Sequence, residues 1–219
     1  AENGLKNGAV GLLNTDWGDN GHWQYQPFSY PGYAYGAALS WNVQANRNLD
    51  LAAVLNTLVF EDATGRTAQA MLELGDAYKA SGPRIHNATS WGQGLLRDLK
   101  GVRRMEGQSK ATWRGRLKAI EESSSKLSGA KPAAPDGALI LREMKAAVRL
   151  AIHGCRRGLL ALEEDPGKLK ASKGRLDADM KEIIKTHRDL WHARNRPGGF
   201  RESVGRMEEA RKAYRPGIT

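Results

Sequence analysis

The chain has 219 residues, of which 40% are hydrophobic and 26% are charged. This length and composition are typical of a soluble globular protein with one domain, or with one domain joined to a smaller piece. No run of about 18 apolar residues occurs, which excludes a transmembrane helix of ordinary length and predicts no membrane partner.

The net charge of +10 is distributed unevenly. Residues 1–60 contain two basic and four acidic residues and sum to −2, so residues 61–219 carry the remaining +12. A basic half can indicate a surface for nucleic acid or membrane. Here basic residues are interleaved with acids, as in RMEE at 206–209, and no long basic tract occurs. We therefore expect a solvated helical surface and no nucleic-acid partner.

Cys155 is the single cysteine, so the chain can form neither an internal disulfide nor a cysteine-rich metal site. It lies in an apolar helical stretch, which favours buried packing. The sequence predicts no cofactor and no bound metal. One cysteine and the lack of a visible signal peptide favour a cytoplasmic location without deciding the compartment.

The predicted elements divide the chain near residue 62. The apolar run at 9–13 ends in polar residues, which predicts one buried parallel strand followed by a loop. Small residues at 35–41 predict a tightly packed turn or helix start. A lone strand leaves its N–H and C=O groups unpaired. We therefore expect residues 1–62 to be a β/α unit that is incomplete or that docks onto a sheet.

Residues 63–219 are predicted to form an α-helical domain, so the protein as a whole is expected to be mainly α. Apolar residues recur there every three or four positions, and Gly- and Pro-containing breakers separate the periodic segments. Helices are expected over residues 50–60, 64–80, 94–105, 111–127, 138–163, 176–191 and 202–214, with a linker at 126–137.

Two acids, a histidine, two tryptophans and several amides follow the predicted strand closely, in the sequence NTDWGDNGHWQ at 14–24. Carbohydrate sites combine such groups, because an indole packs on the C–H face of a sugar ring while carboxylates and amides bind its hydroxyls. Gly18 allows the loop to turn so that Trp17 and Asp19 point the same way. The loop composition therefore suggests a sugar site.

Three other interpretations stay open from the residues alone. Asp16 and Asp19 could form a glycosidase acid/base pair, although both lie on one loop and no second acidic segment is visible. The same two acids with His22 could bind a metal. The acids could also simply cap the following helix.

The loop resembles the last strand and loop of family 20 glycoside hydrolases, the β-N-acetylhexosaminidases. Much of that family has Trp-x-Glu at this point, and TDWGDNGH at 15–22 looks like the branch with a long C-terminal helical domain. Residues 29–42 are similar to the stretch that leads into the final barrel helix. The middle, about 85–170, matches only in helical character. Near the C-terminus, LW at 190–191, NRPGG at 195–199 and Ser203 are similar to the C-terminal signature of that branch.

This resemblance implies that residues 1–62 are the last β/α unit of an incomplete (β/α)8 barrel. The whole enzyme would hydrolyse terminal N-acetyl-D-hexosamine residues. Trp17 would form a wall of the sugar pocket, and Asp19, one methylene shorter than the usual Glu, would bind O4 and O6. Asn14, His22 and Trp41 are further candidate binding residues, with packing as the other role of Trp41.

The family's mechanism is substrate-assisted: the acetamido oxygen attacks the anomeric carbon while an Asp–Glu pair orients it and protonates the leaving oxygen. That pair lies on an earlier barrel strand, so no catalytic residue is expected here and the isolated chain should be inactive. The expected partners are N-acetylhexosamine-terminated glycans and the remainder of the barrel, and a second copy in a homodimer is a further candidate. The alternative is a non-catalytic helical interaction or oligomerisation module with a vestigial sugar loop.

Overall fold

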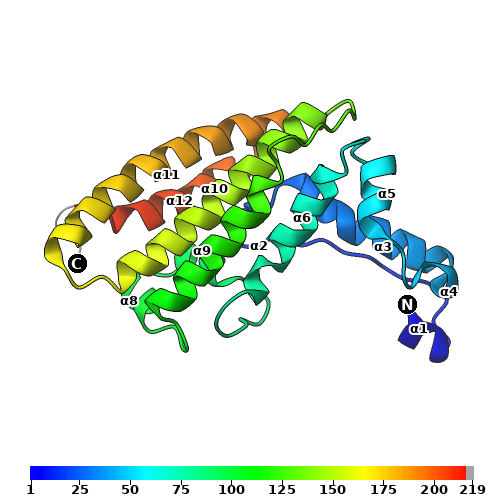
Figure 1. The fold of residues 1–219 in the computed structure, drawn as a ribbon, viewed down its shortest axis with the longest axis horizontal. Helices are drawn as coiled ribbons and strands as arrows, with labels where there is room; N and C mark the ends of the chain where they lie inside the picture. The colour runs from blue at the N-terminus through cyan, green and yellow to red at the C-terminus, as the bar shows by residue number, and fades with distance from the viewer. Residues whose placement is uncertain (216–219) are drawn as a thin grey trace.

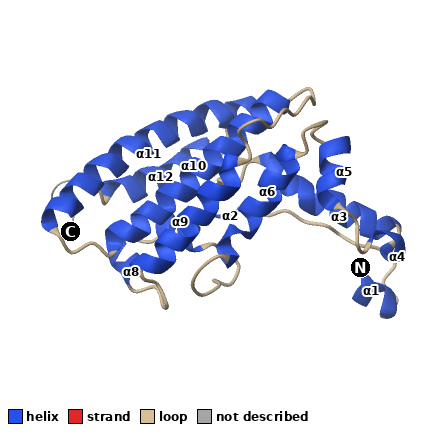
Figure 2. Ribbon diagram, viewed as in Figure 1, coloured by secondary structure: helices blue, strands red, loops and turns tan. Residues whose placement is uncertain are grey.

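The structure, a computed structural model, describes residues 1–215, which form helices and loops and no strand (Figures 1 and 2). The longest helices run side by side in a bundle, and the N-terminal helices extend from one end of it (Figure 1). The α-helices are α1 (Glu2–Lys6), α2 (Asp19–His22), α3 (Tyr30–Trp41), α4 (Val43–Asn46), α5 (Leu51–Leu58), α6 (Arg66–Asp76), α7 (Ser90–Leu96), α8 (Leu99–Arg103), α9 (Lys110–Ser125), α10 (Gly137–Ala161), α11 (Pro166–Arg194) and α12 (Phe200–Lys212), with 3-10 turns η1 (Gln26–Ser29) and η2 (Ala77–Lys79).

Helix α10 is the centre of the bundle, with α7, α8, α9 and α11 packed around it. Its buried apolar residues recur at helical spacing, as Ile140, Met144, Val148, Ala151 and Cys155. The predicted packing role of Cys155 is thereby confirmed, and burial raises the pKa of its thiol to about 12. Such a thiol stays protonated and unreactive at neutral pH.

Local signals place the ends of the helices. The Asp165 carboxylate accepts from the Lys168 N–H (3.0 Å), and Pro166 begins α11. Ser109 and Thr112 form a reciprocal capping box at the start of α9. The first of these caps lies at the predicted breaker after residue 163, and α11 begins there instead of near residue 176, where the next helix is predicted. The prediction of a helical fold beyond residue 63 is confirmed for the part of the chain that the structure describes.

Two glycines allow α10 to approach its neighbours closely. A Cβ atom at Gly158 would lie 2.3 Å from the nearest ring atoms of Trp113 on α9. One at Gly154 would lie 2.5 Å from the carbonyl oxygen of Trp91 on α7. Only a residue without a Cβ fits at these two contacts.

The predicted strand at residues 9–13 is wrong, and within residues 1–215 no β/α unit forms. The chain from 9 to 18 is an irregular loop, and residues 10–17 make no backbone–backbone hydrogen bond to any described residue. The physical reason is that a strand exists only where a second strand pairs with its N–H and C=O groups. No segment of the described chain supplies that partner.

The N-terminal part exposes large apolar side chains. Val10 and Leu13 are 106% and 86% exposed, Trp41 is 90% exposed, and Leu58 is 74% exposed. Helix α3 is rich in apolar residues, yet none of them is buried. These exposed side chains, on the loop at 10–13 and at the ends of α3 and α5, are the uncovered apolar surface of the N-terminal part, whereas Leu55 on α5 is fully buried. No helix within the described part combines the length and apolarity needed to cross a bilayer.

The predicted division near residue 62 stays a prediction. The largest core contains Leu55 and Phe60 from before this point together with Met71 and Trp113 from after it. The hydrophobic contacts are therefore continuous across residue 62 in the structure.

Candidate functional site

A pocket of about 720 Å³, here called the aromatic pocket, lies between the loop at 17–24 and the start of α7. One wall comes from residues 17–24, and the other from 87–96. Indoles, amides, a carboxylate, an imidazole and a hydroxyl share this pocket. Its principal lining residues are Trp17, Asp19, Asn20, His22, Trp23, Gln24, Asn87, Thr89 and Gln93.

The structure brings three of the five predicted binding residues to this pocket and leaves two outside it. Trp17, Asp19 and His22 all line it. Asn14 instead donates from Nδ2 to the Gly32 carbonyl oxygen on α3 (2.7 Å). Trp41 lines a different hollow near the N-terminus, together with apolar residues of the loop. The five predicted residues therefore do not form one site, because Asn14 and Trp41 each lie outside the pocket.

The pocket walls contain unusual backbone conformations. Four non-glycine residues within 1–215 have a positive φ, and three of them line the pocket: Asn20 (57°), His22 (52°) and Asn87 (51°). Gly21, between the first two, has φ 98°. L-residues adopt this left-handed region rarely, and such conformations concentrate at functional sites, where surrounding contacts maintain them.

The alternative roles of Asp16 are not seen in its contacts. Its carboxylate accepts from the Gln24 amide (3.1 Å) and from the Ser29 hydroxyl, so it braces the loop against the turn that precedes α3. It does not accept from a helix N–H as a capping acid does. Among the described residues, no group of three or more His, Cys, Asp or Glu side chains is placed to hold a metal ion.

The wall formed by Asn87, Thr89 and Gln93 was not predicted. Thr89 caps α7 by accepting from the Gly92 N–H (3.1 Å), and a Thr before a helical segment is a sequence signal for that role. No local pattern, however, indicates that α7 begins opposite a loop about 70 residues earlier in the chain.

A series of buried hydrogen bonds, which the sequence did not predict, lies beneath the loop. The Tyr25 hydroxyl is 3.1 Å from His187 Nδ1, and His187 Nε2 is 2.9 Å from Ser203 Oγ. The Ser203 hydroxyl donates to the Gly21 carbonyl oxygen. These contacts join the pocket loop to α11 and α12.

The buried imidazole of His187 makes folding pH-dependent. Burial, with a smaller effect of the nearby His22, lowers the pKa of His187 from 6.5 to about 4. Between these values the unfolded chain binds a proton that the folded chain does not. This contribution to stability is therefore complete above about pH 6.5, and we expect about 3 kcal/mol of it to be lost as the pH falls to 4.

Urea unfolding at pH 7 and pH 4.5 measures this dependence, with the His187→Gln variant as the control. When the pH is lowered from 7 to 4.5, the free energy of unfolding should decrease more in the natural chain than in the variant. Equal pH dependence in the two would show that His187 is not the group responsible.

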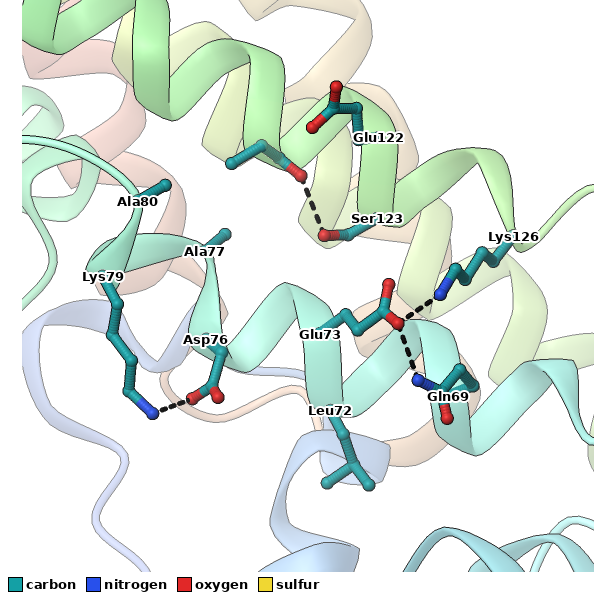
Figure 3. Close-up of a pocket in the computed structure, with 11 residues that line it drawn as sticks. Gln69, Leu72, Glu73, Asp76, Ala77, Lys79, Ala80, Glu122, Ser123 and Lys126 are labelled. Carbon is teal, nitrogen blue, oxygen red and sulfur yellow. Dashed lines mark hydrogen bonds and ion pairs between the residues drawn. The ribbon is translucent and has the colours of Figure 1, made fainter.

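A second large hollow, about 650 Å³, lies between α6 and α9 (Figure 3). Its charged side chains pair with each other or with a near neighbour: Glu73 with Lys126, Asp76 with Lys79 (2.6 Å), and Glu122 with Lys118 (3.6 Å). With these charges neutralised in pairs, the groove offers little to select a charged or polar ligand. It is a weaker candidate than the aromatic pocket.

The aromatic pocket is therefore the candidate site, since it combines the exposed indole of Trp17, hydrogen-bonding groups and left-handed backbone. Such convergence of polar groups in a concave site is typical of ligand binding. Comparisons of the chain with protein-family models, with curated proteins and with solved structures found no match.

Proposed function

We propose that this chain is the C-terminal part of a β-N-acetylhexosaminidase and that its pocket forms one wall of the site for the terminal sugar. The observation that carries the proposal is the convergence of Trp17, Asp19 and His22 on one pocket of about 720 Å³. The same three residues belong to the segment that resembles the family 20 enzymes.

The pocket chemistry suits a pyranose ring. Trp17 is 74% exposed, and its indole N–H already bonds to Thr15 (3.2 Å), so its apolar ring faces are what a ligand would cover. Asp19 supplies carboxylate acceptors for hydroxyls. Across the pocket, Asn87 and Gln93 supply amides that can donate and accept.

The uncovered apolar surface supports the proposal that a barrel completes this site. Exposed apolar patches of this kind mark interaction surfaces. In the complete enzyme, residues 9–13 would pair with neighbouring parallel strands, and α3 would pack over them. The catalytic Asp–Glu pair would come from that part, so this chain would bind the sugar without cleaving it.

The same surface also favours a second candidate function, a helical interaction or oligomerisation module. In that case Val10, Leu13 and Trp41 would contact another protein, or a second copy of the chain, and the pocket would hold no sugar. The two candidates differ in whether a barrel-containing protein that includes this chain hydrolyses N-acetylhexosaminides.

We expect this chain alone to be inactive on 4-nitrophenyl N-acetyl-β-D-glucosaminide, whereas the full-length enzyme hydrolyses it. In that enzyme, Trp17→Ala should lower kcat/KM about 100-fold, because truncating an aromatic side chain that the bound sugar covers costs roughly 2–3 kcal/mol. Asp19→Asn should lower it about tenfold or more through loss of charge-assisted hydrogen bonds. Steady-state kinetics measures both values.

Asp76→Asn is the matched control, because this acid lies in the other hollow and pairs with Lys79. It should leave kcat/KM unchanged. An active enzyme that tolerates Trp17→Ala and Asp19→Asn would contradict the sugar-binding role of the pocket. Hydrolysis by neither protein would favour the interaction module.

A further inference from the structure

We infer that His187 and Ser203 are positioning residues for the pocket, through which the helical bundle holds the loop at 18–23 in its ligand-binding conformation. The functional meaning of this inference rests on the proposed sugar site. Neither residue lines the pocket, so both act through the loop. The helical domain would then be a working part of the binding site.

The donor and the acceptor of each hydrogen bond between the bundle and the loop can be assigned. A carbonyl oxygen can only accept, so the Ser203 hydroxyl donates to Gly21 and must accept from His187. His187 Nε2 therefore carries the proton, and the unprotonated Nδ1 accepts from the Tyr25 hydroxyl (3.1 Å). Every hydroxyl and ring nitrogen in this chain of bonds has a partner. Such satisfied buried networks specify one arrangement of the elements they join.

Further contacts attach the same loop to the bundle. Trp23 donates from its indole N–H to the Ser203 carbonyl oxygen (3.2 Å). The ring of His22 meets that of Trp191 edge-on, with centroids 6.1 Å apart. A Cβ atom at Gly21 would lie 3.4 Å from Ser203 Cα, so the loop backbone lies directly on α12.

These contacts explain how the left-handed backbone between Asp19 and Trp23 persists. Unfavourable φ values at Asn20 and His22 are maintained only where surrounding contacts determine the conformation. His187 and Ser203 are each 1% exposed. Removing the Ser203 hydroxyl would leave His187 Nε2 and the Gly21 carbonyl oxygen without their partner, a state that buried polar groups avoid. The loop would then shift or admit water, and Asp19 and His22 would move with it.

The bundle contains a matched control for this network. His153 is also fully buried, with Nδ1 2.7 Å from Asp179 and Nε2 2.7 Å from the Tyr214 hydroxyl. It joins α10 and α11 to the residues that follow α12, and its two partners do not line the aromatic pocket. Tyr214→Phe therefore removes an equivalent buried hydroxyl without touching the loop.

The first test uses the 219-residue chain and no sugar. In Ser203→Ala we expect a shifted indole N–H resonance of Trp23 and amide exchange at residues 18–23 at least tenfold faster than in the natural chain. Ser203→Thr, which keeps the hydroxyl, should restore both values. Tyr214→Phe should leave both unchanged even where it lowers overall stability.

The second test measures 4-nitrophenyl N-acetyl-β-D-glucosaminide kinetics in the full-length enzyme. Ser203→Ala should raise KM about tenfold and change kcat less, because the loop binds the sugar and supplies no reacting group. Tyr25→Phe, a milder change at the far end of the chain of bonds, should act in the same direction. Tyr214→Phe should leave KM unchanged.

The outcomes separate this inference from the proposed function. An active enzyme in which Ser203→Ala behaves like Tyr214→Phe in loop exchange and in KM would overturn the positioning role and leave the sugar site standing. If the enzyme is inactive but amide exchange at 18–23 is still faster in Ser203→Ala, the proposed activity is contradicted. The positioning of the loop by the bundle is then supported.

Discussion

Gly158→Ala is expected to destabilise the protein by about 2–3 kcal/mol, because it forces a methyl group into a space that is already filled. The new Cβ would lie 2.3 Å from two ring atoms of Trp113, whose side chain is fully buried and cannot move aside freely. The expected sign is opposite to that for an ordinary helix interior, where replacing glycine with alanine stabilises by about 1 kcal/mol.

Gly174→Ala on α11 is the matched control for this prediction. A Cβ at Gly174 would have no heavy atom within 4 Å, so ordinary helix propensity should apply. We expect this variant to gain about 0.5–1 kcal/mol. Urea unfolding of the two variants measures the contrast. Changes of the same sign would contradict the close contact between α10 and Trp113.

Arg194→Met should destabilise the protein by about 3–5 kcal/mol, since it leaves a buried carboxylate without its cation. Glu143 is 1% exposed, and both its oxygens accept from Arg194, at 2.6 and 2.8 Å. Hydrogen bonds from Arg194 to Glu143 and, more weakly, to Asp136 raise the pKa of the guanidinium. Removing one member of such a pair is far more harmful than removing both.

Two comparisons make the second prediction specific. The double variant Arg194→Met/Glu143→Leu should regain at least half of the lost unfolding free energy, because no buried charge remains. Arg103→Met, which breaks an exposed pair with Glu164, should change stability by less than about 1 kcal/mol. Equal losses in Arg194→Met and Arg103→Met would show that burial does not strengthen the first pair.

The two glycines and the ion pair show what the sequence does not reveal by itself. Glycine inside a helical segment predicts a weaker helix, and nothing local distinguishes Gly158, which contacts an indole, from Gly174, which faces solvent. Arg194 and Glu143 are 51 residues apart, so their contact follows from how α10 and α11 pack.

Sequence by itself determined the helical part of this protein. The spacing of Leu176, Met180 and Ile183 predicts a helix over 176–191, which the structure confirms within α11, although the helix begins ten residues earlier, at Pro166. It also identified Trp17, Asp19 and His22 as neighbours in one loop. These features depend on hydrogen bonds and contacts within a few residues, which local sequence controls.

Only the tertiary structure decided the rest, because it depends on partners distant in the chain. The apolar run at 9–13 predicts a strand, yet a strand requires a second strand, and the described chain offers none. Trp41 shares the chemistry of the loop but lies away from the pocket. Ser203 reaches Gly21 across 182 residues because α12 packs against the loop, and that packing places the bundle directly beneath the candidate site.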